Sequence, residues 1–295
     1  MMFRRLLLTL MLLGATAPAL ALDVVATSTS MGALVRAVAG ERADLTVLVG
    51  PDQDLHYLEA KPTMIRALRS ADLVVAVGAE LEIGWLPLAI QSAANRAIQP
   101  GQPGYFEAAA QVSLIDHGAP ADRAQGDVHP LGNPHVNMDP VRMVAVARAL
   151  AERFALLDAA NAASYRRGAE RFAEQVEQRL PRWRQQVAGA PGVVLYHRDA
   201  NYLLEQLDVP FLGTIEPIPG VPPSGRDLRA LRNALEGQRG IILFATFESP
   251  RAPQRLAEDL GWPFEAIPLD PPLDADGEGY LALIDRWVTA ISATR

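Results

Sequence analysis

The sequence of 295 residues contains no cysteine. Disulfide bonds are therefore excluded, and we expect no lipid-anchored cysteine at the start of a mature chain. Aromatic residues are scarce, at 6%, which argues against a cleft lined with rings for an organic solute. No basic patch indicates a nucleic-acid partner. Beyond the first residues, apolar runs are short and interrupted by charges or prolines, so no second membrane span is expected.

The first residues have the pattern of a secretory signal peptide. Arg4 and Arg5 form a short positive region, residues 6–13 are apolar, and Ala19 to Ala21 has the small-x-small form of a cleavage site. The apolar run is too short to span a membrane. We expect residues 1–21 to be removed, which moves the net charge from -7 to -9. The mature chain is then predicted to be a monomer in the periplasm, without direct membrane insertion.

Alternating strands and helices predict an α/β fold with two β/α lobes and parallel central sheets. The expected strands are 23–27, 45–49, 73–77 and 112–115, then 193–196, 211–215, 241–245 and 264–269. The expected helices are 31–38, 61–70 and 83–94, then 199–207, 224–235, 250–260 and 280–294. Residues 139–187 read as almost continuous helix, with a brief break at 158–160 and an interruption at Pro181. We therefore predict lobes at 22–158 and 189–295, joined by a long rigid helix at 159–188.

The histidines stand at informative positions. The sequence has five: His56, His117, His129, His135 and His197. His56 lies just past a predicted strand, His135 at the entrance to the long helical segment, and His197 directly after a strand. Asp270 directly follows the last strand. Ligands of open α/β sheets bind beyond the carboxyl ends of strands, so these side chains are predicted to converge between the lobes.

Three imidazoles and one carboxylate suit zinc, which favours four nitrogen, sulfur or oxygen ligands in a tetrahedron. Imidazole also suits copper, nickel and iron, whereas manganese prefers carboxylates. Four protein ligands leave no open position for an activated water, which favours carriage over hydrolysis. A single histidine in a loop is usually a solvated surface residue. The prediction of His56, His135, His197 and Asp270 as ligands therefore depends on the four positions together.

At these segments the sequence resembles the zinc and manganese solute-binding proteins of ABC importers, the cluster A-I family. The family's Pro-Gly-x-Asp-Pro-His-x-x-Glu loop corresponds to residues 51–59, where Asp52 and Leu55 replace the usual Gly and Pro. Its Asn-Pro-His-x-x-x-Asp-Pro pattern is matched at 133–140. Its Tyr-His pair after a strand is matched at 196–197. Its aspartate after the last strand, often followed by Pro, is matched at 270–271. The resemblance runs in order over nearly the whole mature chain.

The resemblance implies a periplasmic receptor that captures zinc and passes it to a cognate ABC permease in the inner membrane, and it implies no enzyme activity. A histidine at position 197, where manganese members carry a carboxylate, favours the zinc type. Glu248 resembles a glutamate near the cleft edge, and Glu59 is a candidate accessory ligand. The loop at 117–134 is at most a reduced form of the family's histidine-rich loop. A periplasmic metal chaperone that loads the receptor is left open.

Other classes of protein remain as alternatives. A receptor for manganese or another divalent metal would use the same two-lobe fold. An exported zinc hydrolase would need an open coordination position and a general base, for which Glu59 is the nearby candidate, and the sequence has no His-Glu-x-x-His motif. A receptor for an organic solute or a metal chelate would need an aromatic- and arginine-rich cleft. A surface adhesin is disfavoured because no lipid anchor is expected.

Overall fold

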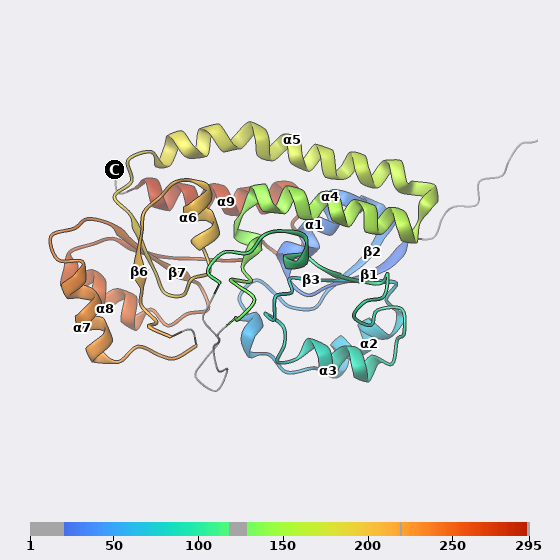
Figure 1. Cartoon of the computed structure of the whole chain (residues 1–295), viewed down its shortest axis with the longest axis horizontal. Helices are drawn as coiled ribbons and strands as arrows, with labels where there is room; N and C mark the ends of the chain where they lie inside the picture. Colours follow the sequence, from blue (N-terminus) through green and yellow to red (C-terminus); the bar gives the residue numbers. More distant parts are fainter. Residues whose placement is uncertain (1–20, 118–128, 219, 294–295) are drawn as a thin grey trace, which may run out of the picture.

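Two parallel sheets lie beside each other beneath one long helix (Figure 1). The structure, a computed structural model, describes residues 21–117, 129–218 and 220–293. The predicted signal peptide, apart from Ala21, and most of the loop at 117–134 therefore lie outside the described residues. None of the helices in the described segments has the length and apolar character needed to cross a membrane.

Each sheet contains four described strands in the same spatial order. The first has the order β2-β1-β3-β4 and the second the order β6-β5-β7-β8, and every pairing is parallel. The strands are β1 (Leu22–Ala26), β2 (Ala43–Val47), β3 (Leu73–Ala76), β4 (Tyr105–Glu107), β5 (Val193–Leu195), β6 (Phe211–Thr214), β7 (Ile241–Ala245) and β8 (Phe264–Ile267). The predicted class of two parallel α/β lobes is confirmed. In both sheets the chain reverses its winding direction beside the first strand, the point where ligands of such folds bind.

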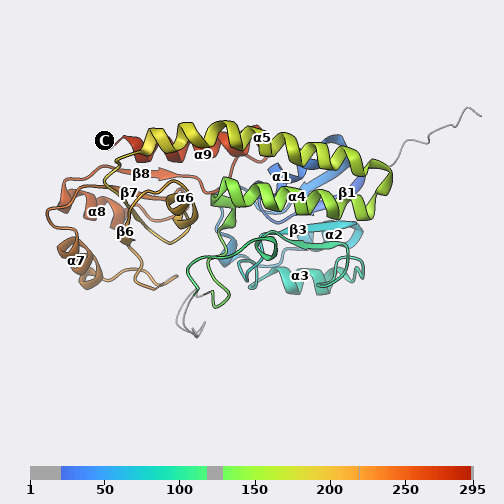
Figure 2. The ribbon, with the colours of Figure 1, turned by 45° about the horizontal axis from the view of Figure 1, so that its top comes forward.

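Helices cover both faces of each sheet (Figure 2). They are α1 (Thr29–Ala39), α2 (Pro62–Ser70), α3 (Leu86–Ala93), α4 (Pro140–Leu157), α6 (Asn201–Gln206), α7 (Gly225–Ala234), α8 (Arg251–Leu260) and α9 (Gly277–Ser292). In the first lobe, α1 and α4 lie on one side of the sheet, and α2 and α3 on the other. In the second lobe, α7 begins with the capping box of Ser224 and Asp227, which ties its first turn to the preceding loop.

The long helix α5 (Ala162–Val187) extends across both lobes. A break at Asp158 and a short 3-10 turn (Ala159–Asn161) separate it from α4, as the sequence predicts. The expected interruption at Pro181 is wrong, because α5 continues through this residue. The last helix, α9, packs beneath α5 and also contacts α1 of the first lobe. The two lobes are thus joined by packed helices on one side.

The strand predicted at 112–115 is wrong, and the edge strand of the first sheet is Tyr105–Glu107 instead. Val112, Leu114 and Ile115 do pack against the core, which explains their apolar pattern. The amide of Ile115, however, donates to the hydroxyl of Tyr202 at 3.2 Å. A side chain from the second lobe here satisfies a backbone group that a strand neighbour would otherwise satisfy.

The main hydrophobic core is continuous between the lobes. It contains β1, β3, β5 and β7 residues together with the inner faces of α1, α4, α5 and α9. Trp85, Trp183 and Trp287 are among its largest fully buried side chains. A second cluster lies under α7 and α8, around Phe244 and Trp262. Continuous packing along α5 and α9 favours a rather rigid body, with the carboxyl ends of the strands of both lobes facing one pocket.

Candidate metal centre

His56 is held by the loop that follows β2. Asp54 caps a short 3-10 turn (Leu55–Tyr57), and its Oδ1 accepts from the backbone amide of His56 at 2.9 Å. The same oxygen lies 2.7 Å from Nδ1 of the His56 ring. Burial alone would raise the pKa of Asp54, but hydrogen bonds and charge from His56 outweigh it and lower the pKa. An ionised carboxylate only accepts, so Nδ1 of His56 carries the hydrogen.

His135 is positioned in the same way by a residue two places before it. Oδ1 of Asn133 accepts from the backbone amide of His135 at 3.0 Å and lies 2.8 Å from its Nδ1. The Asn133 amide group in turn donates to the carbonyl of Arg198 at 2.6 Å and to Asp116 at 3.1 Å. Burial, with smaller contributions from neighbouring imidazoles, holds the pKa of His135 well below its usual value. His135 is therefore neutral at physiological pH, the state that binds metal.

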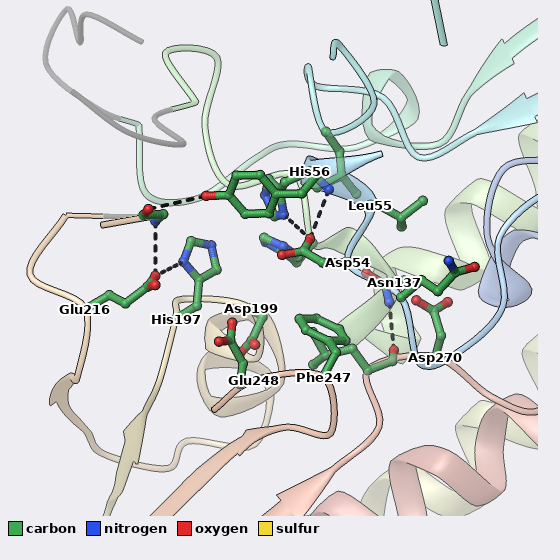
Figure 3. Close-up of a pocket in the computed structure, with 16 residues that line it drawn as sticks. Asp54, Leu55, His56, Asn137, His197, Asp199, Glu216, Phe247, Glu248 and Asp270 are labelled. Atoms are coloured by element: carbon green, nitrogen blue, oxygen red, sulfur yellow. Dashed lines mark hydrogen bonds and ion pairs between the residues drawn. The ribbon is translucent and has the colours of Figure 1, made fainter. Parts of the chain in front are cut away.

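His197 enters from the second lobe, directly after β5. Its Nδ1 lies 3.3 Å from Oε2 of Glu216, which follows β6 (Figure 3). Burial alone would lower the pKa of His197. The hydrogen bond with Glu216 and the charges of Asp199 and Glu216 outweigh burial, and the pKa of His197 is raised. The carboxylate again fixes the hydrogen on Nδ1 and leaves Nε2 for a ligand.

The three rings meet at one point between the lobes. One potential ligand atom from each of His56, His135 and His197 lies within 4.8 Å of the others. The ring centroids are 5.3 Å apart for His56 and His135, 5.6 Å for His56 and His197, and 5.2 Å for His135 and His197. Because each Nδ1 faces an oxygen acceptor, each Nε2 keeps its lone pair for a cation. The predicted convergence of these histidines is thus present in the structure.

Asp270 borders the same pocket but is outside this group of close ligand atoms. Its Oδ1 accepts from the backbone amide of Ser30 at 2.8 Å, at the start of α1. Burial raises the pKa of Asp270, although hydrogen bonds from Ser30, Ser28 and Thr29 act in the opposite direction. Figure 3 shows Asp270 beside Asn137, apart from His56 and His197. Its assignment as a ligand stays a prediction.

The accessory candidates differ in their positions. Glu59 is exposed and does not line the pocket, whereas Glu248 does. Burial, followed by the charges of Glu216, Asp199 and Asp54, raises the pKa of Glu248 to about 8. Burial also raises the pKa of Asp199 to about 6. Several carboxyl groups therefore crowd around the histidines, and their repulsion adds to burial in raising these pKa values. A bound cation would relieve that repulsion and favour the ionised carboxylates.

Sequence reasoning missed the residues that orient the rings. Asp54 and Asn133 each stand two places before a histidine, the spacing at which Asx side chains accept hydrogen bonds from the local backbone. That signal was present in the sequence. Glu216 gave no comparable signal, because it follows a different strand from His197. His129 lies within the loop predicted at 117–134, yet its Nε2 is 3.1 Å from Nε2 of His56.

A family profile and solved structures match this chain over nearly its whole described length. The profile of a family described as zinc-uptake complex component A, periplasmic, matches residues 24–294. The metal ABC transporter substrate-binding lipoprotein ScbA of Streptococcus cristatus is 23% identical over 158 residues, which cover 52% of this chain and 48% of that relative. The aligned region thus spans about half of the relative's length.

Two solved structures show the same fold. A deletion mutant of ZnuA with zinc bound superposes with a TM-score of 0.74 and 20% identity, covering 93% of this chain and 100% of that one. FpvC of Pseudomonas aeruginosa in complex with Mn2+ superposes with a TM-score of 0.75 and 19% identity, covering 93% and 98%. At these identities the superpositions establish the fold alone.

Proposed function

Because the chain belongs to the family of periplasmic component A of zinc-uptake complexes, we propose that it captures Zn2+ between its lobes and delivers it to an ABC-type importer. The family is one of metal-binding, substrate-binding transport proteins. The observation that carries the proposal is the meeting of His56, His135 and His197, from both lobes, at one point. Such a site ties the lobes together when an ion is bound.

The choice of zinc follows from the donor atoms. Three neutral imidazole nitrogens suit zinc, whereas Mn2+ prefers carboxylate and carbonyl oxygens. Each ring is also fixed by an oxygen at Nδ1, the arrangement that makes imidazole a better ligand for zinc. Solved proteins of this fold hold zinc in one case and manganese in another. Selectivity here therefore rests on this chain's own side chains.

The proposed cycle consists of zinc capture, docking on the permease and zinc release. The receptor is exported by the signal peptide predicted at 1–21, takes zinc in the periplasm as a monomer, and docks on a cognate permease. A shift of a loop or a lobe that removes one or two histidines from the ion suffices for release, because the ligands belong to separate segments. Loading by a periplasmic metal chaperone is compatible with the open pocket.

The direct test is a titration of the mature chain with zinc. The His197→Ala variant is expected to bind zinc at least about tenfold more weakly, because one of the side chains that coordinate the ion is lost. His117→Ala serves as the control, because His117 contacts the carbonyl of Leu131 and lies outside the histidine group. Unchanged affinity in His197→Ala refutes the assignment. Competition with Mn2+ in the same experiment tests selectivity, and a preference for Mn2+ would refute the zinc proposal.

A further inference from the structure

A short sequence recurs at corresponding places in the two lobes. Residues 65–70 read Ile-Arg-Ala-Leu-Arg-Ser, and residues 228–233 read Leu-Arg-Ala-Leu-Arg-Asn. The first copy lies in α2 and the second in α7, which correspond because the two sheets have the same strand order. Since α2 begins at Pro62 and α7 at Gly225, both copies start at the fourth residue of their helix.

The apolar residues of this repeat contact the core, and its arginines face solvent. Leu68 of α2 is buried, and Leu231 of α7 packs against the second hydrophobic cluster. Both helices lie on the sides of their sheets that face away from α5 (Figure 1, Figure 2). The arginines form two pairs, called the arginine pairs below, which are the exposed Arg66 and Arg69 on α2 and the exposed Arg229 with the half-buried Arg232 on α7.

The arginine pairs have no acidic partner within the described part of the chain. Their one side-chain hydrogen bond there runs from Arg232 to Oδ1 of the adjacent Asn233, at 2.6 Å. Asp227, the acidic residue of the two helices, is engaged in the capping box of α7. By contrast, the exposed Arg166 of α5 is paired with Glu152 of α4 at 2.6 Å. The arginine pairs therefore remain available to an acidic group outside the chain.

Stabilisation of the helices does not account for all four arginines. A positive charge in the last turn interacts favourably with the helix dipole, which suits Arg69 and Arg232. Arg66 and Arg229 lie one turn earlier, where this interaction has faded. In a chain with a formal net charge of -7, two such basic sites at corresponding places indicate contact with an acidic partner.

The loops that lead into α2 and α7 both line the proposed zinc pocket. His56 and Tyr57 lie in the loop before α2. Glu216 and Gly220 lie in the loop before α7, and Glu216 contacts the ring of His197. The hydroxyl of Tyr57 donates to the carbonyl of Gly220 at 3.4 Å, so the two loops meet across the pocket. A partner that holds both helices therefore acts on the segments that position two of the histidines.

We propose that the arginine pairs are docking sites, one on each lobe, for acidic groups on the periplasmic face of the importer; this rests on the zinc delivery proposed above. Two corresponding sites fit a partner with two equivalent halves, because a symmetric assembly presents the same groups twice. An acidic partner repels the rest of this acidic receptor, and this repulsion steers the arginine pairs toward it.

Delivery of zinc to native membranes tests the proposal. Spheroplasts of the producing cells, washed free of periplasmic proteins, are incubated with the mature chain loaded with radioactive zinc. The charge reversals Arg66→Glu with Arg69→Glu, and Arg229→Glu with Arg232→Glu, are each expected to raise the half-saturating receptor concentration at least about tenfold. Glutamate and arginine have similar helix propensities, so both helices are retained.

The matched control reverses two arginines of α5, Arg167→Glu with Arg171→Glu. Both side chains are exposed and have no ion pair within the described segments, and α5 lies on the opposite side of the sheets. This variant is expected to deliver zinc as wild type does. All three variants should keep wild-type zinc affinity in competition with a chelator, because these arginines lie outside the histidine group.

Four results would overturn the docking proposal. These are uptake from both reversed variants equal to the control, an effect confined to one arginine pair, a loss of zinc affinity together with uptake, and arginine-dependent binding to protein-free vesicles of phosphatidylglycerol and phosphatidylcholine. The last result would assign the sites to lipid headgroups. If the wild-type chain neither binds zinc nor drives uptake, the proposed function itself fails. If it drives uptake that does not depend on the arginine pairs, the docking proposal alone fails.

Discussion

Asn133 connects the metal-binding faces of the two lobes through one side chain. The side-chain Oδ1 of Asn133 accepts hydrogen bonds from both the backbone amide and the ring Nδ1 of His135. Its amide group reaches the carbonyl of Arg198, the residue after His197. The hydroxyl of Tyr202, also from the second lobe, donates to the backbone carbonyl of Asn133 at 2.6 Å. The side chain therefore sets the orientation of one histidine and fixes it relative to the segment that carries another.

Replacing this asparagine is expected to weaken metal binding without removing a ligand. In Asn133→Ala, Nδ1 of His135 loses its acceptor, and the ring samples both tautomers and other orientations. Zinc affinity should fall about 10- to 100-fold, the usual loss for such a partner, as measured by competition titration. The matched control is Asn95→Ala, which removes hydrogen bonds to Leu68 and Ala71 far along the first lobe. Equal zinc affinities in the two variants would contradict this role of Asn133.

The proton competes with zinc most strongly at His197. The pKa of this ring is raised above the ordinary 6.5 by Glu216 and Asp199 despite burial, whereas the pKa of His135 is lowered. Protonated imidazole cannot bind metal. As the pH is lowered from 8, zinc affinity should therefore start to decrease before the pH reaches 6.5. Competition titrations between pH 8 and pH 5.5 measure this onset.

The matched variant for this pH dependence is Glu216→Gln. It keeps an oxygen near Nδ1 of His197 but removes the charge that raises the pKa, so the fall in affinity should start at a lower pH. A constant affinity from pH 8 down to pH 6 in the wild type would contradict the assignment, and so would identical profiles for the two proteins.

The helices that join the lobes depend on a close approach of backbones. Gly168 of α5 lies against α1, where an added Cβ would meet the carbonyl oxygens of Val38 at 2.2 Å and Ala37 at 2.8 Å. Backbone atoms of a packed helix cannot move aside as the end of a side chain can. The two helices must therefore separate to admit even one methyl group.

Gly168→Ala is expected to lower the free energy of unfolding by about 1–3 kcal/mol, the usual cost of overpacking, and urea denaturation measures it. Gly225→Ala is the matched control. Gly225 is the first residue of α7, where an added Cβ would meet only the end of Arg229 at 3.5 Å. Equal stability of the two variants would indicate that α5 and α1 are less tightly packed than described.

Local patterns predicted most elements and failed where tertiary contacts decided. The break near Asp158 was predicted at an aspartate, a residue of low helix propensity, and the structure places a short 3-10 turn (Ala159–Asn161) directly after it. Pro181 stays inside α5 because packing of the helix outweighs the loss of one backbone hydrogen bond. The apolar segment 112–115 has the pattern of a strand. Its Ile115 amide instead donates to the hydroxyl of Tyr202, which lies far away in the sequence. No local pattern could reveal that partner.

In the molecule as a whole, the sequence predicted the candidate centre better than its surroundings. Strand ends in a parallel fold gather at one edge, so His56 and His197 could be brought together from their positions after strands. His135 stands at the entrance to the long helical segment, and its place in the group was predicted from the four positions together and from the family pattern at 133–140. The contact of Asp270 with Ser30 depends on how α1 meets the second lobe, and pattern reasoning has no access to that distance. The pairing of His129 with His56 likewise depends on the path of a loop without periodicity.

The central claim is that one zinc ion binds where His56, His135 and His197 meet. The most direct measurement is the anomalous difference density, recorded at the zinc edge, of crystals of the zinc-loaded mature chain. We predict a single strong peak about 2.0–2.2 Å from Nε2 of each of the three rings. A peak elsewhere, or one bound by carboxylates without these histidines, would contradict the account.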